Sequence, residues 1–341
     1  MTQPIFTALI GYGFAGKTFH APLIRAVNGL NLAMVASTDP AKVHADFPQA
    51  QVIADPFAVA THPDVALVVI ASPNESHFPL AMAALAAGKH VVVDKPFTLT
   101  VAEAEQLAQA AKASKTQLSV FHNRRWDADF LALKQVLATG CLGEIVHFES
   151  HFDRFRPLVR DRWREQAGPG SGLWFDLGPH LIDQALQLFG LPDTVSADFA
   201  LQRDHAAAVD WCHVVLGYPR LRVVLHASAL VAGGVPRFAI HGKAGSLIKF
   251  GLDVQEDQLK AGGTPHDAGF GVDPTPYTLF QNEQTHAHPC PVGNYLHYYQ
   301  AVYASIREGG PNPVPASEAI AVMRVLACAL SAATQGRTLT L

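Results

Sequence analysis

The sequence predicts an α/β chain with an N-terminal doubly wound parallel sheet, followed by an α+β domain built on a mostly antiparallel open sheet. Residues 1 to about 120 alternate apolar strands with helical stretches, which is the pattern of a parallel sheet. After residue 122, successive strands are joined by short turns, which favours antiparallel neighbours. We therefore expect two domains, at residues 1–121 and 122–341.

The strands of the first domain are short apolar runs bounded by turn residues. We expect them at 5–10, 32–36, 51–53, 66–71, 90–93 and 117–121. Helices lie between these strands. One at 76–87 closes at Gly88, and another at 100–113 starts with Thr100 and Glu103 in the spacing of a capping box.

A glycine-rich turn, GYGFAG, follows the first strand and precedes a stretch compatible with a helix at 15–27. Gly11 permits a tight turn, Gly13 lets a pyrophosphate approach the backbone, and Gly16 lets helix and strand pack closely. The phosphates would then meet a helix N-terminus. We predict a Rossmann-type dinucleotide-binding domain, with a ligand-free glycine turn as the alternative. The turn residues expected at the cofactor are Gly11, Gly13, Phe14, Ala15 and Gly16.

The end of the second strand bears on the choice between NAD and NADP. Asp39 lies about twenty residues past the glycines, where a carboxylate binds a ribose 2′-hydroxyl and favours NAD. Ser37, Thr38 and Lys42 favour NADP, because two hydroxyl donors and a cation suit a 2′-phosphate. These residues alone leave both cofactors open.

Lys95 follows the fifth strand, at the carboxyl edge of the sheet where ligands of open α/β folds bind. Its ammonium could donate to a substrate hydroxyl and stabilise the alkoxide that develops, with Asp94 holding the lysine in position. A solvated lysine at a strand end is the alternative.

Two further segments are expected to meet the cofactor. One follows the fourth strand, and the other lies at the predicted domain junction, where its residues either bracket the cofactor or pack the junction. The candidates are Ser72, Asn74 and His77 in the first segment and Asn123, Arg124 and Trp126 in the second. Asp94 and Lys95, which follow the fifth strand, are also expected at the cofactor.

The second domain begins with a helix at 127–139 and a strand at 144–152, followed by a loop and a helix at 179–189. The open sheet predicted for this domain has a face that must be covered, so we expect the chain to form a homodimer or homotetramer. Residues 261–276, rich in glycine and proline, are expected to form a surface loop. Further strands are predicted near 195–202, 210–217, 221–229, 236–241 and 246–250, and helices at 294–308 and 317–333.

Asp176 and His180 stand four residues apart, which places both on one face of a helix. With the helix beginning at residue 179, His180 would lie in its first turn, where the helix dipole favours the neutral imidazole and its use as a base. Asp176 could orient the ring or act on the substrate. The alternatives are an N-cap for Asp176 and a buried structural role for His180.

Residues 153–164 contain five arginines with interleaved aromatic side chains. Planar donors and aromatic rings suit a substrate rich in hydroxyl groups. A solvated or subunit-contact loop is the alternative. The candidate substrate-binding residues here are Asp153, Arg154, Arg162 and Trp163.

Composition excludes several classes of protein. The 341 residues are 49% hydrophobic with a net charge of −4, which gives no basic surplus for binding nucleic acid.

No apolar run looks long enough for a membrane span, and no secretory leader is apparent, so we expect a cytoplasmic protein. Four scattered cysteines predict free thiols. Neither of the histidine pairs His286/His288 and His147/His151 comes with a nearby matched third ligand of the usual kind, so no metal site is expected.

Taken together, GYGFAG, Asp94-Lys95-Pro96 and Asp176-x-x-x-His180 resemble the Gfo/Idh/MocA oxidoreductases over nearly the whole chain. That family more often has Glu in place of Asp94, a departure that leaves the assignment of Lys95 intact. The runs FHNRRWD, FDRFRP and RDRWRE look like the branch that includes NADP-dependent scyllo-inositol dehydrogenases.

The resemblance implies reversible oxidation of a secondary alcohol on a sugar or cyclitol, with hydride passing to a nicotinamide. It implies that His180 is the acid/base, that Lys95 polarises the hydroxyl, and that Asp176 orients the alcohol. It tips the cofactor narrowly to NADP. The alternatives are a dinucleotide-binding regulatory protein without turnover and an enzyme of the same scaffold that acts on a non-sugar substrate.

Overall fold

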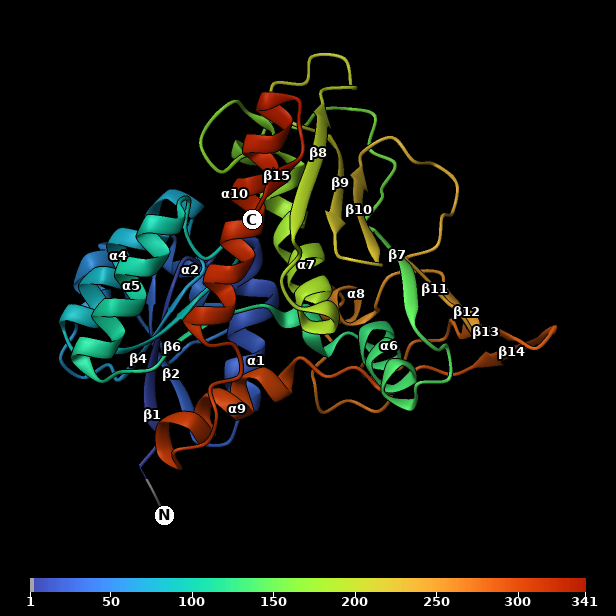
Figure 1. Ribbon diagram of the computed structural model, residues 1–341. Helices are drawn as coiled ribbons and strands as arrows, with labels where there is room; N and C mark the ends of the chain where they lie inside the picture. The colour runs from blue at the N-terminus through green and yellow to red at the C-terminus, as the bar shows by residue number, and fades with distance from the viewer. Residues whose placement is uncertain (1–2) are drawn as a thin grey trace. The chain divides into compact units, whose positions relative to one another are not determined.

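The computed structural model describes residues 3–341, and the chain divides into two compact units (Figure 1). The first unit runs to Asn123 and also contains residues 255–270 and 294–320. The second consists of residues 124–254, 271–293 and 321–341. This division differs from the predicted one, which left residues 255–270 and 294–320 with the second domain.

The first unit contains a six-stranded parallel sheet, as predicted, in the order β3-β2-β1-β4-β5-β6. The central strand β1 lies between β2 and β4, so the order of strands reverses there. In open parallel sheets, ligands bind at the carboxyl ends of strands at such a switch point. The strands are β1 (Ile5–Ile10), β2 (Leu30–Ala36), β3 (Gln51–Ile53), β4 (Leu67–Ile70), β5 (His90–Val93) and β6 (Leu118–Val120).

The capping box predicted for the helix at 100–113 is present at the start of α5 (Val101–Ser114). Thr100 and Glu103 form the expected capping box, in which the Glu103 amide donates to Thr100 Oγ1 at 3.2 Å and the Thr100 amide donates to Glu103 Oε2 at 3.0 Å. The helical segments are a π-helical turn (Gly16–His20), α1 (Ala21–Ala26), α2 (Pro40–His44), α3 (Pro56–Ala60), a 3-10 turn (Asn74–Ser76), α4 (His77–Ala86), α5 (Val101–Ser114), α8 (Gln255–Lys260) and α9 (Leu296–Arg307).

Helix α9 belongs to the first unit because its tyrosines pack on the end of the parallel sheet. The Tyr298 hydroxyl donates to Ser119 Oγ at 2.9 Å, and the Tyr299 hydroxyl lies 2.6 Å from His20 Nδ1. Both tyrosine rings contact Phe121. The two hydroxyl contacts join residues 179 and 279 positions apart, which local sequence patterns do not indicate.

The second unit contains a nine-stranded sheet in the order β14-β13-β12-β11-β7-β10-β9-β8-β15. All neighbouring pairs are antiparallel except β7 and β10, so the predicted mostly antiparallel sheet is confirmed. The strands are β7 (Ile145–His151), β8 (Thr194–Ala200), β9 (Trp211–Gly217), β10 (Arg222–Ser228), β11 (Phe238–Gly242), β12 (Gly245–Lys249), β13 (Tyr277–Gln281), β14 (Gln284–His288) and β15 (Leu339–Thr340).

Helix α7 (Gly172–Phe189) covers one face of this sheet, where Leu181 and Ile182 share a core with Phe148 of β7 and Leu225 of β10 (Figure 1). Two further helices, α6 (Ala128–Thr139) and the later part of α10 (Ala316–Gln335), contribute to the same core. The predicted start of α7 at residue 179 is wrong. The helix begins seven residues earlier and contains Pro179 in its interior.

Helix α10 is long and apolar enough to cross a membrane by length and composition, contrary to the sequence expectation. Its side chains Val322, Leu326 and Ala329 are buried in the core of the second unit. One face of the helix therefore packs in this core, and 39% of its most apolar stretch is buried.

We predict that Lys249→Ala lowers the free energy of unfolding by about 3–5 kcal/mol, because it leaves the Asp273 carboxylate buried without its cation. Lys249 Nζ lies 2.9 Å from Asp273 Oδ2, and the two side chains are 0% and 1% exposed. Urea denaturation of the variant measures the loss.

The matched control is Lys243→Ala, which removes an ion pair of 2.6 Å to Glu144 in the same unit. Its side chains are 51% and 41% exposed, so water already screens the pair, and a change of at most about 1 kcal/mol is expected. Equal effects of the two substitutions would contradict the prediction.

Candidate functional site

Of the three glycines in the turn after β1, Gly11 and Gly16 have no room for a side chain, whereas Gly13 faces open space. Gly11 has φ +96°, and a Cβ there would lie 2.7 Å from the Ala71 carbonyl oxygen. A Cβ at Gly16 would lie 2.0 Å from the carbonyl oxygen of Gly11. At Gly13, a Cβ would meet no atom of the described residues within 4 Å. The turn therefore fits a dinucleotide, because a pyrophosphate can approach the backbone at Gly13.

Phe14 and Ala15 continue this turn into the helix. Phe14 is 56% exposed, and its ring packs edge-on against Phe19 with the ring centroids 5.8 Å apart. Lys260 Nζ lies 5.7 Å from the centroid of the Phe14 ring. An exposed aromatic ring and a cation thus flank the candidate phosphate site.

The end of β2 is organised by a helix cap. Asp39 Oδ1 accepts a hydrogen bond of 3.0 Å from the Lys42 amide, and Ser37 Oγ accepts one of 3.1 Å from the Asp39 amide. The side chains of Thr38, Asp39 and Lys42 are exposed. Capping gives Asp39 a structural role that does not depend on a cofactor.

Two of the three candidates in the segment after β4, Asn74 and His77, are buried. Both ring nitrogens of His77 contact carbonyl oxygens, Nδ1 that of Pro96 at 2.9 Å and Nε2 that of Ser72 at 3.0 Å. Burial lowers the pKa of His77, although the charge of Asp94 and the contacts with backbone carbonyls oppose this shift. Asn74 is also buried, whereas Ser72 is partly exposed. His77 joins the loops after β4 and β5, which is a structural role that the sequence did not indicate.

Asp94 and Lys95 follow β5, as predicted. Asp94 Oδ1 accepts a hydrogen bond of 2.8 Å from the Lys95 amide and lies 3.8 Å from His20 Nε2. Burial raises the pKa of Asp94, but the nearby charges of His20, Lys95 and His77 outweigh it and lower the pKa. The carboxylate therefore fixes the backbone of Lys95, whose side chain is partly exposed.

In the second unit, Asp176 and His180 lie one helical turn apart on α7, as their spacing predicted. His180 is 5% exposed, and its ring stacks on Phe152 with the centroids 6.5 Å apart. The first-turn interpretation of His180 is wrong, because α7 begins at Gly172 and the dipole acts within the first turn only. Since Ser171 is the N-cap residue, the capping alternative for Asp176 is also wrong.

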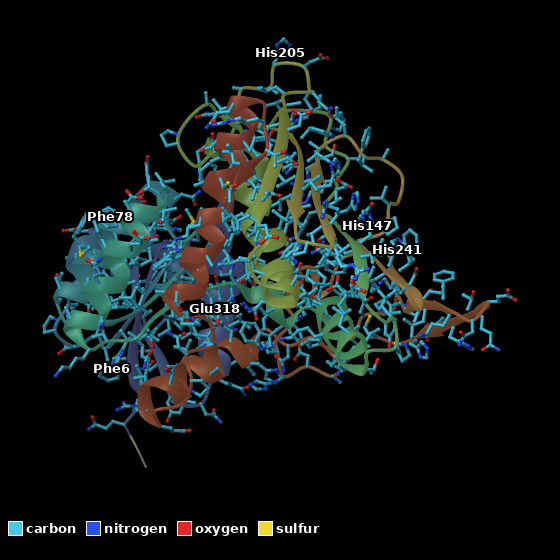
Figure 2. The ribbon with its side chains drawn as sticks, in the orientation of Figure 1. Phe6, Phe78, His147, His205, His241 and Glu318 are labelled. Carbon is cyan, nitrogen blue, oxygen red and sulfur yellow. The ribbon has the colours of Figure 1, made fainter. Side chains whose placement is uncertain are left out.

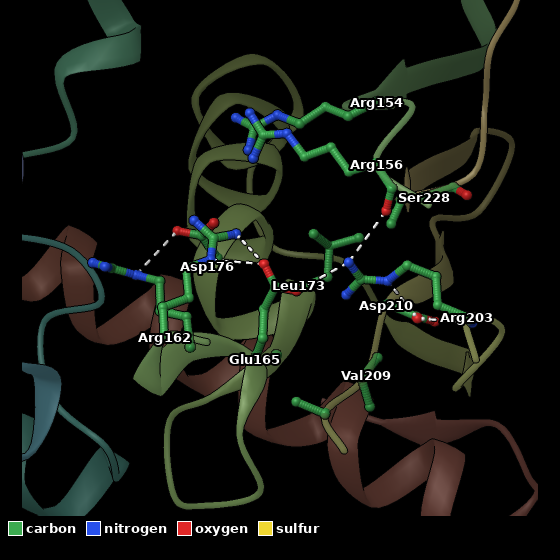
Figure 3. A pocket seen from close by; sticks show the side chains of 14 residues that line it. Arg154, Arg156, Arg162, Glu165, Leu173, Asp176, Arg203, Val209, Asp210 and Ser228 are labelled. Carbon is green, nitrogen blue, oxygen red and sulfur yellow. Dashed lines mark hydrogen bonds and ion pairs between the residues drawn. The ribbon is translucent and has the colours of Figure 1, made fainter. Parts of the chain in front are cut away.

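Asp176 lines a pocket rich in arginine, drawn in Figure 3. The pocket carries two more arginines than carboxylates. Arg203 Nη1 and Arg162 bind Glu165 at 3.0 and 2.7 Å, and Arg164 Nε lies 3.6 Å from Asp176 Oδ1. Its charged lining consists of Arg154, Arg156, Arg162, Arg164, Arg203, Glu165, Asp176 and Asp210.

The remaining predicted residues are divided among different environments. Arg154 lies over the Phe152 ring, with 5.0 Å from its guanidinium carbon to the centroid, and Trp163 stacks with Arg164 at 4.4 Å. Arg124 donates to Asp127 at 3.2 Å within the second unit. Asn123 is buried and Trp126 is half-buried.

Asp153 does not line the arginine-rich pocket but contacts two histidines. Its Oδ2 lies 3.1 Å from His151 Nδ1, and its Oδ1 lies 3.6 Å from His226 Nε2. Sequence reasoning missed this group because His226 is on another strand. The alternation His147, Glu149, His151, Asp153 was the available signal, since a period of two places these residues on one face of a strand.

Comparisons with known proteins agree with this architecture. Residues 5–122 match the family model described as "Oxidoreductase family, NAD-binding Rossmann fold", and residues 134–341 match "Oxidoreductase family, C-terminal alpha/beta domain", the two Gfo/Idh/MocA models. The chain is 50% identical to the uncharacterized oxidoreductase YdgJ of Escherichia coli K12, with 100% of both chains covered.

Two further relatives cover almost all of the chain. It is 39% identical to the scyllo-inositol 2-dehydrogenase (NADP(+)) IolW of Bacillus subtilis, covering 99% of this chain and 96% of that protein. A crystal structure described as an oxidoreductase from Klebsiella pneumoniae is 55% identical, with a TM-score of 0.94 and coverage of 100% of this chain and 96% of that one.

We predict that Gly13→Ala weakens binding of NADPH and NADH by about tenfold or more while the melting temperature stays unchanged. The new methyl group meets no protein atom of the described residues within 4 Å, so it occupies only the space where the pyrophosphate would approach. Titration of protein or nicotinamide fluorescence measures the affinity.

Gly16→Ala is the contrasting variant, because its methyl group would lie 2.0 Å from the Gly11 oxygen and should lower the melting temperature. Parental dinucleotide affinity in a stably folded Gly13→Ala protein would contradict the assignment of this turn.

Proposed function

The chain belongs to the Gfo/Idh/MocA family of oxidoreductases, and from this premise we propose that it is an NAD(P)-dependent dehydrogenase acting on a secondary alcohol of a cyclitol or sugar. A scyllo-inositol-type substrate is favoured, because the chain is similar over nearly its whole length to IolW. The observation that carries the proposal is the presence of Lys95 at the carboxyl end of β5 together with Asp176 and His180 one turn apart on α7.

A bound nicotinamide dinucleotide supplies the hydride acceptor. The Lys95 ammonium donates a hydrogen bond to the substrate hydroxyl and stabilises the alkoxide as its charge develops. His180 accepts the hydroxyl proton on a ring nitrogen and so acts as the general base. Asp176 accepts a hydrogen bond from the substrate and orients the alcohol. In the reverse direction, His180 returns the proton to the oxygen.

NADP is the proposed cofactor. Asp39 caps α2 through Oδ1, so its presence is explained without a ribose contact. Lys42 is exposed and carries the positive charge that a 2′-phosphate requires. The side chains of Ser37 and Thr38 add two hydroxyl donors at the same strand end.

A second candidate substrate is an anionic sugar derivative, such as a sugar acid or sugar phosphate. The pocket that contains Asp176 has five arginines and three carboxylates, a formal surplus of two positive charges. Arginine is the side chain best suited to bidentate recognition of carboxylate or phosphate groups. This candidate keeps the same hydride transfer and changes only the group recognised beside the alcohol.

We predict that the purified chain reduces NADP with at least one member of a panel of inositol isomers, aldoses, sugar acids and sugar phosphates. Lys95→Ala and His180→Ala should each lower kcat by about 10²–10⁴-fold, because each removes a group that acts on the reacting proton or oxygen. Absorbance of the reduced nicotinamide at its near-ultraviolet maximum measures turnover.

Dinucleotide affinity is the control for this experiment, and both variants should retain it. Near-parental turnover in both variants would overturn the residue roles. A complete lack of hydride transfer across the panel, with dinucleotide binding intact, would favour the regulatory alternative or a substrate of another class.

For the cofactor, we predict that Lys42→Ala raises the KM for NADP by roughly tenfold, the effect of losing one charge-assisted hydrogen bond, and leaves the KM for NAD unchanged. Parallel steady-state kinetics with the two dinucleotides measure the ratio. An unchanged KM for NADP would remove Lys42 from the cofactor site.

A further inference from the structure

One face of the sheet in the second unit carries a row of histidines and carboxylates. Along β7, Phe148 and Phe152 point into the core, whereas His147, Glu149 and His151 alternate with them on the other face. His147 stacks on His241 of the neighbouring strand β11, with the ring centroids 5.8 Å apart, and both are labelled in Figure 2. Such a row of imidazoles exposes many potential ligand nitrogens on one surface.

Three side chains in this row converge. His151 of β7 pairs in register with His226 of the parallel strand β10, and Asp153 follows the end of β7. Asp153 Oδ2 lies 3.1 Å from His151 Nδ1, and Asp153 Oδ1 lies 3.6 Å from His226 Nε2. One ligand atom from each residue falls within 4.8 Å of the other two. Ligands about 2.0–2.2 Å from a tetrahedral metal ion lie about 3.3–3.6 Å from one another, and the contacts of 3.1 and 3.6 Å are close to that spacing.

We propose that His151, Asp153 and His226 bind a divalent transition-metal ion, with zinc as the best-suited member of this class. Two imidazole nitrogens and one carboxylate oxygen make up a three-ligand set that leaves a fourth position for water. The site ties the end of β7 to β10.

Neighbouring groups are arranged as in the outer shell of a metal site. His151 Nε2, the nitrogen away from Asp153, lies 3.1 Å from Glu149 Oε2, and Glu149 Oε1 is held by His147 Nε2 at 2.7 Å. His226 Nδ1 lies 3.4 Å from His213 Nδ1. A carboxylate on the remote nitrogen of a ligating histidine fixes the tautomer and directs the other nitrogen to the metal.

Burial of Asp153 is a second, independent indication of a ligand. Its side chain is 6% exposed, and Oδ1 makes no hydrogen bond to any of the residues described. A buried carboxylate oxygen without a hydrogen bond is costly, and a bound cation would remove that cost.

The test uses the untagged full-length chain, stripped with a chelator and titrated with zinc chloride by calorimetry. We expect about one zinc ion per chain. His151→Gln, Asp153→Asn and His226→Gln should each abolish this stoichiometric binding. Circular dichroism and thermal melts establish that the variants fold. Substitution with cobalt(II) gives a second readout. We expect visible absorption bands typical of a low-coordinate site with nitrogen and oxygen ligands, and no charge-transfer band from a thiolate.

The matched control is the double variant His286→Gln/His288→Gln, which removes two histidines from β14, the first exposed and the second half-buried, and should bind zinc as the parent does. Glu149→Gln should weaken binding by about 10–100-fold without changing its stoichiometry, as expected of a residue that positions a ligand. Absence of stoichiometric binding by the parent, or equal loss in the β14 control, would overturn the proposal and leave a hydrogen-bonded histidine–carboxylate network.

Discussion

The close approach of Gly16 to Gly11 is the constraint on which the first unit depends. With 2.0 Å between the position of a Gly16 Cβ and the Gly11 oxygen, the helix can begin directly above the end of β1 only if residue 16 has no side chain. A Cβ at Gly11 would likewise lie too close to the carbonyl oxygen of Ala71, which follows the neighbouring strand β4. The turn is thereby fixed at the switch point of the sheet, and Gly13 is left as the position where a ligand can reach the backbone.

In the second unit, the corresponding constraint is the period-two alternation along β7. Phe148 and Phe152 must pack under α7, so their neighbours His147, Glu149 and His151 are placed on the opposite face. Phe152 also lies against the ring of His180. A single strand thus supports the candidate catalytic histidine on one face and presents the proposed metal ligands on the other.

Sequence patterns predicted the elements whose hydrophobic period is regular. Both sheets and the capping box of α5 follow from such local signals. The hairpin of β13 and β14 was missed, because β14 is mostly exposed and its turn uses Asn282 and Glu283 at positive φ in place of glycine. The early start of α7 was missed because Pro179 resembles a first-turn proline. Grouping His226 with His151 required the register of two strands distant in sequence.

The arginine pocket places a condition on the proposed role of Asp176. Asp176 can receive a substrate hydroxyl only if its contact with Arg164 is weak or can be shared. The two side chains are 21% and 31% exposed and 3.6 Å apart, so this pair contributes at most about 1 kcal/mol, less than a new hydrogen bond to the carboxylate would supply. By contrast, Arg203 and Glu165 are each 7% exposed at 3.0 Å and hold the pocket wall in place. The pair of Asp176 and Arg164 is therefore weaker than the buried pair of Arg203 and Glu165, which is the condition that the proposed role of Asp176 requires.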